Sequence, residues 1–167
     1  METLEALIEK LELQPHPEGG YFKETYRSEE VISKTCLPDV FQGERNYSTG
    51  IYYLLKSDDF SAFHRINQDE MWHFYLGDSI TLSMISEEGI LTTIEIGNDV
   101  LKGQSPQFVV PKDYWFAAKV QRPNSYSLVG CTVAPGFDFN DFELASCKEL
   151  VDKFPQHIEI IKTLTRQ

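Results

Sequence analysis

From residue 21 to residue 133 the chain is a series of short stretches rich in β-branched and aromatic residues, separated by turn residues. Such stretches are typical of β-strands, and no helical period is long enough to interrupt them. Consecutive strands without helices between them predict an all-β, antiparallel sandwich or barrel. We expect the strands at about 21–27, 47–56, 60–66, 70–76, 79–86, 90–96, 107–110, 114–120 and 125–133.

Helical periodicity appears only towards the two ends of the chain. Apolar residues recur at i, i+3, i+4 and i+7 within 3–13, and helical spacing returns within 147–154 and 158–164. Residues 15–20 read Pro-His-Pro-Glu-Gly-Gly, a composition that excludes regular structure and predicts a shaped loop. Residues 28–46 have no clear period and predict a long surface excursion, a kind of loop that is often functional.

The length and composition fit one domain. The chain has 167 residues, of which 41% are hydrophobic, and a domain near this size buries about 70% of the surface of its unfolded chain. We therefore expect a single domain over 1–167, with a barrel core at about 15–145. A helical tail at about 146–164 is expected to pack outside it.

The net charge restricts the partners of the protein. With 15 Lys and Arg against 26 Asp and Glu, the formal net charge is -11. A field of this sign repels phosphate backbones and anionic lipid, and no basic stripe offsets it. Apolar stretches are far shorter than a membrane span, and the chain opens Met1-Glu2-Thr3 without a basic and apolar leader. We expect a cytoplasmic protein that binds neither nucleic acid nor membrane.

The three cysteines, Cys36, Cys131 and Cys147, include no Cys-x-x-Cys pair. Neither a disulfide framework nor a thiolate zinc site is indicated, so we expect reduced thiols. Cys131 lies in an apolar run and is expected to be a small buried residue.

Polar residues inside the strand pattern concentrate between residues 60 and 77. Because side chains alternate across a strand, His64 shares a face with small and apolar neighbours, and Glu70 shares one with Trp72 and Phe74. If this face is the barrel interior, both groups point into one cavity from adjacent strands. Burial there would raise the pKa of Glu70 and lower the pKa of His64. Such a pair suits proton transfer or metal binding, and a hydrogen-bonded core pair is the structural alternative.

The same residues resemble the first motif of the cupins, jelly-roll proteins in which two His and a Glu form one wall of a metal site. His64 and Glu70 match this motif, but Ile66 stands in place of its second His. The second cupin motif is similar to residues 111–116, where Phe116 replaces the ligand His. Two of the four ligands that the resemblance implies are therefore absent.

This ligand count predicts no cofactor. Two protein groups are fewer than a catalytic zinc or iron site uses. A divalent metal stays an alternative only if a bulge turns His73 inward to join His64 and Glu70. On a regular strand, His73 lies on the face opposite Glu70.

A closer resemblance covers nearly the whole chain. The resemblance consists of five matching segments. The first begins with His16-Pro17-Glu18-Gly19-Gly20 and ends at residue 28, and four more follow in order at 48–55, 63–77, 110–118 and 127–145. Together they are similar to the uncharacterised family often called cupin-5. This resemblance implies a double-stranded β-helix, the cupin jelly roll, with an N-terminal helix and C-terminal helices packed outside. It also implies a homodimer, which open sheet edges favour.

A weaker resemblance is to the dTDP-4-dehydrorhamnose 3,5-epimerases, which are cupins without a metal. Their catalytic His lies where His64 falls, and their late Trp-Asn-Asp is similar to Phe139-Asn140-Asp141. The resemblance implies that Asp141 is the carboxylate partner of His64. Val129 occupies the position of the epimerases' Tyr acid, which leaves Tyr53 or Tyr126 as substitutes.

Five further side chains are candidates for binding a ligand. Four are aromatic and could stack a ring, with plain core packing as the alternative. The fifth is an arginine that shares a strand face with Lys23 and could hold an anionic group, with a solvated edge charge as the alternative. Glu24, on the opposite face of that strand, would be unusual if buried without a partner. The five candidates are Trp72, Phe74, Trp115, Phe116 and Arg27.

Two classes of function follow from these candidates. The first is a small-molecule-binding, metal-independent isomerase or epimerase of a sugar-like or keto substrate, with His64 as general base and Arg27 holding an anionic group. Its orienting and acid groups would come from Glu70, Asp141, Tyr53 and Tyr126. The second class is a ligand-sensing cupin that binds a small polar ring without catalysing a reaction on it. A metal-dependent cupin enzyme using His64, Glu70 and His73 is the remaining alternative.

Overall fold

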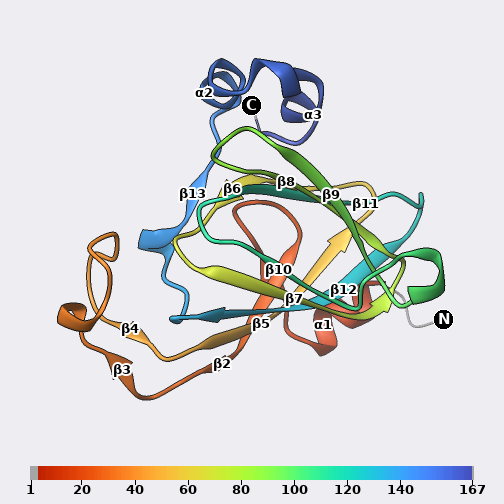
Figure 1. Cartoon of the computed structure of the whole chain (residues 1–167). Coiled ribbons are helices and arrows are strands. Elements are labelled where there is room, and N and C mark those ends of the chain that lie inside the picture. Colours follow the sequence, from red (N-terminus) through yellow and green to blue (C-terminus); the bar gives the residue numbers. More distant parts are fainter. Residues whose placement is uncertain (1–3, 167) are drawn as a thin grey trace.

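Two antiparallel sheets packed face to face form the body of the molecule in the computed structural model, which describes residues 4–166 (Figure 1). The larger sheet contains, in spatial order, β1 (Gln14–Pro15), β2 (Tyr21–Arg27), β5 (Thr49–Lys56), β12 (Tyr126–Ala134), β7 (Asp69–Gly77) and β10 (Gln107–Val110). The smaller contains β13 (Glu143–Leu144), β6 (Ser61–Arg65), β11 (Trp115–Val120), β8 (Ile80–Ile85) and β9 (Leu91–Ile96). Neighbouring strands come from distant parts of the sequence, which confirms the predicted jelly roll.

All nine predicted strands form, with ends within about two residues of those expected from the sequence. The two-residue strands β1 and β13 and the pair β3 (Val31–Ile32) and β4 (Arg45–Asn46) were not predicted, because runs this short show no period. The excursion at 28–46 therefore contains a small sheet of its own and a 3-10 turn, η1 (Lys34–Cys36). It extends away from the body of the sandwich (Figure 1).

Helices pack on the outer faces of both sheets, as expected. The helix α1 (Leu4–Lys10) is shorter than predicted and packs its apolar side chains against a cluster formed by Leu13, Leu54 and Leu128. The tail forms α2 (Cys147–Lys153), η4 (Pro155–His157) and α3 (Ile158–Thr163), which lie over the smaller sheet (Figure 1). Two further 3-10 turns are η2 (Val100–Lys102) and η3 (Phe139–Asp141). No helix within residues 4–166 is long and apolar enough to cross a membrane.

The apolar core lies between the two sheets, and strand alternation decides which side chains enter it. On β11, Phe116 points inward and is 1% exposed, whereas Trp115 points outward to the tail helices. On β12, Val129 and Cys131 point inward, and Cys131 is buried as expected. The core thus fills most of the interior and leaves space at the site described next.

Candidate functional site

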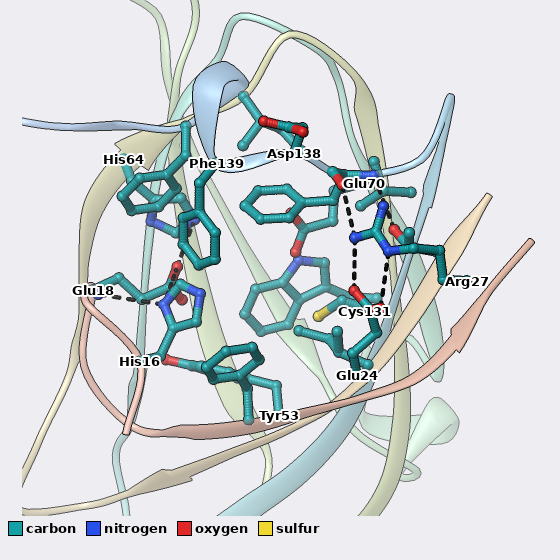
Figure 2. Close-up of a pocket in the computed structure, with 18 residues that line it drawn as sticks. His16, Glu18, Glu24, Arg27, Tyr53, His64, Glu70, Cys131, Asp138 and Phe139 are labelled. Carbon is teal, nitrogen blue, oxygen red and sulfur yellow. Dashed lines mark hydrogen bonds and ion pairs between the residues drawn. The ribbon is translucent and has the colours of Figure 1, made fainter. Parts of the chain in front are cut away.

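A cavity of about 290 Å³ lies between the sheets (Figure 2). Its walls come from strands β2, β5, β6, β7 and β12 and from the loop at 15–20. Residues 137–142, which include η3, complete the lining. Most of the apolar lining is aromatic: Phe22, Tyr53, Trp72, Phe137, Phe139 and Phe142. Five residues predicted from the sequence contribute to the lining, namely His64, Glu70, Tyr53, Arg27 and Trp72. The structure therefore brings part of the predicted site together.

Glu18, which sequence reasoning missed, is the centre of the polar cluster in this cavity. Its Oε2 lies 3.1 Å from Nε2 of His64 and 3.3 Å from Nδ1 of His16. Its Oε1 accepts a hydrogen bond of 2.7 Å from the hydroxyl of Ser61. The residue is only 6% exposed, so a carboxyl lies in the interior beside two imidazoles and one hydroxyl.

The loop at 15–20 turns Glu18 inward because its two glycines adopt backbone angles that other residues avoid. Gly19 and Gly20 have φ of 117° and 67°. A Cβ on Gly19 would lie 2.1 Å from the carbonyl oxygen of Phe60. The hydroxyl of Tyr53 donates to the carbonyl of Gly19 at 2.9 Å and fixes the loop from the larger sheet. The Gly-Gly pair was therefore the signal in the sequence that could have pointed to Glu18.

The tautomer of His64 follows from its two neighbours. Its Nδ1 lies 2.8 Å from the carbonyl oxygen of Ala62, which can only accept, so Nδ1 carries a hydrogen and donates it. In the neutral ring, Nε2 is then an acceptor that faces Oε2 of Glu18. Two acceptors at this distance repel each other unless a proton lies between them. The two side chains therefore form a unit that holds one shared proton.

Burial decides where that proton resides. It raises the pKa of Glu18 and lowers the pKa of His64 to about 4, because removal from water disfavours the charged form of each group. Burial also lowers the pKa of His16. The neutral forms of all three groups are favoured together. The carboxyl of Glu18 accordingly holds the shared proton and donates it to Nε2 of His64.

Glu70 lies across the cavity from this cluster (Figure 2). Burial raises its pKa to about 8, and the presence of a second carboxyl, that of Glu18, acts in the same direction, whereas hydrogen bonding by Cys131 and Trp72 opposes it. These are the directions expected from the sequence for His64 and Glu70. Their strands, β6 and β7, belong to opposite sheets and are not adjacent as predicted. The two side chains therefore face each other across the sandwich.

Arg27 lines the cavity together with Glu24, although the sequence placed the two on opposite faces of β2. The expectation was wrong because a bulge lies between Glu24 and Tyr26 and shifts the alternation by one residue. The guanidinium donates from Nε and Nη2 to the Glu24 carboxylate at 2.9 and 2.7 Å. Arg27 thus has a bidentate anionic partner within the protein.

Asp141 is buried but does not contact His64, so the expected His64–Asp141 pair is not formed. Its two oxygens accept bidentate hydrogen bonds of 2.6 and 2.7 Å from Arg45, and Gln68 donates at 2.7 Å. Asp141 is the last residue of the 3-10 turn η3, and its side chain lies against Arg45 of β4 instead of in the cavity. Glu18 takes the place that the resemblance gave to Asp141.

The other candidates also lie outside the cavity lining. Tyr126 packs on the outer cluster beneath α1, and Trp115 packs beneath the tail helices. Phe74 packs against the core, and Phe116 packs on His64 with ring centroids 4.0 Å apart. His73 points away from Glu70, as expected for a regular strand at that point, and contacts Thr132 and Gln107 at 2.9 Å.

The residues at the cupin metal positions do not fit a metal. The sites of two missing ligands are occupied by the buried apolar side chains of Ile66 and Phe116. His73, the possible third ligand, lies outside the cavity lining. Within residues 4–166, no group of three or more His, Cys, Asp or Glu side chains has an arrangement that could hold a metal ion.

Comparison with protein families agrees with the sequence blocks and the fold. The family model described as "Cupin superfamily (DUF985)", cupin-5, matches residues 5–145 and confirms the predicted resemblance. An uncharacterised protein of Saccharomyces cerevisiae is 34% identical over 149 residues, which cover 83% of this chain and 73% of that protein.

Solved structures extend the comparison. A protein of Shewanella oneidensis has a TM-score of 0.90 at 42% identity, and a hypothetical protein of Leishmania major has 0.89 at 31%; each match covers 99% of both chains. Oxalate decarboxylase of Bacillus subtilis has a TM-score of 0.54 at 14% identity, covering 90% of this chain and 36% of that one. At this identity the likeness extends to the fold alone.

Proposed function

The chain belongs to the cupin superfamily family DUF985, and we propose that it is a metal-independent isomerase or epimerase of a small keto or sugar-like substrate. The observation that carries this proposal is the carboxyl of Glu18, buried between two neutral imidazoles and lining an aromatic cavity. A carboxyl with a raised pKa is a stronger base when it loses its proton, and such groups concentrate at functional sites.

In this mechanism Glu18 takes the proton from the substrate in the form of the protein that has lost the shared proton, because a carboxyl that still holds that proton is not a base. Both ring nitrogens of His64 are already engaged, by Ala62 and by Glu18. His64 therefore orients the carboxyl and shares the proton after transfer. It does not itself abstract the substrate proton, which is the general-base role that the sequence predicted for it. Ser61 fixes the other carboxyl oxygen. The Glu18–His64 unit is thus a positioned general base.

Glu70 supplies the complementary acid on the opposite wall. With its pKa raised to about 8, it keeps its proton near neutral pH and can donate it to a substrate oxygen or carbon. Two carboxyls with separate environments are a recurring arrangement for acid and base roles. The rate of proton exchange between substrate and solvent should rise with pH as Glu18 loses its proton above its ordinary pKa. It should fall again as Glu70 loses its proton near pH 8. A bell-shaped profile of rate against pH is the expected result.

Solvent deuterium exchange tests the proposal directly. Dihydroxyacetone, acetoin and a ketohexose would be incubated with the protein in D₂O, and loss of the α-proton signal followed by NMR. Glu18→Gln should lower the exchange rate at least about 100-fold, and His64→Asn should also lower it. His73→Asn, which alters an imidazole outside the cavity, is the matched control and should leave the rate unchanged. Binding of these compounds without exchange by the wild type would favour the ligand-sensing alternative.

Two sequence-based expectations stay proposals beside this function. A homodimer is one, and light scattering that gives a mass near 19.2 kDa at micromolar concentration would reject it. A cytoplasmic location, without nucleic-acid or membrane partners, is the other. The net charge of -11 supports the absence of such partners.

A further inference from the structure

The arginine of the cavity has little capacity left for a ligand. Besides its two hydrogen bonds to Glu24, Arg27 donates from Nη1 to Asn46 at 2.8 Å and from Nη2 to the carbonyl of Phe137 at 3.0 Å. Four of the five N–H groups of a guanidinium are thus used within the protein. An anionic ligand would have to displace these partners.

The fixed charges of the cavity also oppose an anion. Of the four carboxyl groups that line it, Glu18 and Glu70 are favoured in their neutral forms. Glu24 offsets the single guanidinium in the lining among the described residues, that of Arg27, and Asp138 adds a further acidic group, so no positive charge is left over for an anion. Asp138 lies close enough to Arg27 to raise the pKa of that arginine further. The net charge of -11 repels anions at longer range.

Two hydrogen-bond donors remain at the Glu70 wall. Trp72 is 1% exposed and lines the cavity, and its buried Nε1 makes no hydrogen bond of good geometry to any described residue. It nevertheless lies close enough to Glu70 to affect the titration of that carboxyl. A buried N–H without a partner costs free energy that a ligand acceptor would recover. A protonated carboxyl beside it adds an O–H donor.

We propose that the cavity takes an uncharged carbonyl compound with a flat apolar part, whose oxygen accepts hydrogen bonds from Trp72 and Glu70, and that it rejects carboxylates and phosphates. This inference rests on the function proposed above and names its substrate class. The aromatic lining packs on the flat part, and the carbonyl oxygen lies opposite the Glu18–His64 base. The anion-holding role predicted for Arg27 is replaced by a role in neutralising Glu24.

Acetophenone and benzoate form a matched pair of probes, since they share the ring and differ in the charge of the carbonyl group. Ligand-observed NMR titration of the wild type at pH 7 should show binding of acetophenone and at least about tenfold weaker binding of benzoate. Glu24→Gln frees the guanidinium of Arg27 and should strengthen benzoate binding about tenfold. Trp72→Phe should weaken acetophenone binding several-fold, whereas Trp115→Phe, outside the cavity, should leave it unchanged.

These measurements separate the ligand class from the reaction. Benzoate binding as tight as acetophenone would overturn the inference while leaving deuterium exchange at Glu18 possible. Failure of acetophenone to bind, or binding unaffected by Trp72→Phe, would overturn it as well. Because binding is read without turnover, loss of exchange in the Glu18→Gln variant bears only on the proposed reaction.

A second inference concerns Arg166, which follows α3 and reaches back to the cavity loop. Its Nη2 donates to the carbonyl of Glu18 at 3.2 Å, to Oδ1 of Asp59 at 2.7 Å and to the carbonyl of Phe60 at 2.7 Å. The guanidinium also lies 4.0 Å from the centre of the Phe60 ring. The other oxygen of Asp59 accepts from the backbone N–H of Gly20 at 2.9 Å. Arg166 and Asp59 therefore hold both sides of the Glu18 loop.

We infer that Arg166 is a positioning residue for the Glu18 carboxyl. The titratable or charged groups that act on Glu18 from the elements around it are His16, His64, Tyr53, Glu70, Cys131 and Arg166. Arg166 is the one permanently charged cation of this set, so its removal changes both the position of the loop and the field at the carboxyl.

Carboxyl ¹³C NMR of Glu18 tests this role independently of turnover. In Arg166→Gln the midpoint of the Glu18 titration should move to higher pH and deuterium exchange should slow about tenfold. Arg166→Lys should restore part of both. Lys162→Gln, an exposed change on the same helical tail, is the control and should alter neither. A lower melting temperature in Arg166→Gln with an unchanged Glu18 titration would overturn the positioning role.

Discussion

Two buried carboxyls, Asp141 and Glu18, show what separates a structural acid from a candidate catalytic one. Both are nearly inaccessible, at 4% and 6% exposure. Asp141 has a permanent cation, Arg45, bound through both oxygens, and lies outside the cavity lining. Glu18 has two neutral imidazoles for partners and lines the cavity. Asp141 thus has a fixed countercharge within the protein, whereas Glu18 shares a proton with a neutral base.

Asp141→Asn is expected to have the largest effect, because it leaves the Arg45 guanidinium buried without its countercharge. Breaking one partner of a buried ion pair costs about 3 to 5 kcal/mol, which lowers the melting temperature by about 6 to 20 °C in a domain of this size. Calorimetry measures this directly. Glu143→Gln removes the partner of Arg65 in an exposed ion pair and serves as the control, with a cost below about 1 kcal/mol. If the two substitutions lowered the unfolding free energy equally, the ion pair of Asp141 would be worth no more than an exposed one, and its structural role would be rejected.

Glu70→Gln should stabilise the protein in a pH-dependent manner. The pKa of Glu70 in the folded state is about 8, above the ordinary value of 4.5. The stability associated with its protonated form is present below pH 4.5 and is lost as pH rises through 8. A glutamine cannot ionise, so the variant should match the wild type below pH 4.5 and exceed it by about 2 to 4 kcal/mol above pH 8. Urea unfolding across this range would show it, and a constant difference at all pH values would contradict it.

Glu18→Gln should have the smallest effect on stability, which sharpens the contrast with Asp141→Asn. The amide resembles the protonated carboxyl in size and can still donate to His64 and accept from Ser61. We expect a change in unfolding free energy within about 1 kcal/mol below pH 4.5, where the carboxyl holds its proton in both the folded and the unfolded chain, measured by denaturant titration. A loss comparable with that of Asp141→Asn would mean that Glu18 is an ionised structural group.

The strands were predictable because alternation and turn residues are local signals, and the nine long strands follow them closely. The bulge in β2 was not, since it depends on pairing with β5 and leaves no mark in the spacing of Glu24 and Arg27. His64 and Glu70 were found from their polar character among apolar neighbours. Glu18 was missed because it lies in an irregular loop, where periodicity gives no facing direction. Asp141 was misplaced because the family resemblance fixes an order of residues, not the direction of a side chain.

The environment of Trp72 gives the protein a natural reporter. The chain contains two tryptophans: Trp72 in the cavity wall, and Trp115 on the outer side of the smaller sheet, where the Arg65 guanidinium lies 4.6 Å from its ring centre. Indole fluorescence depends on the hydrogen bonding and polarity around the ring. In Trp115→Phe, all tryptophan emission would come from the cavity wall, so a spectrum without any added label would follow the filling of the cavity in real time.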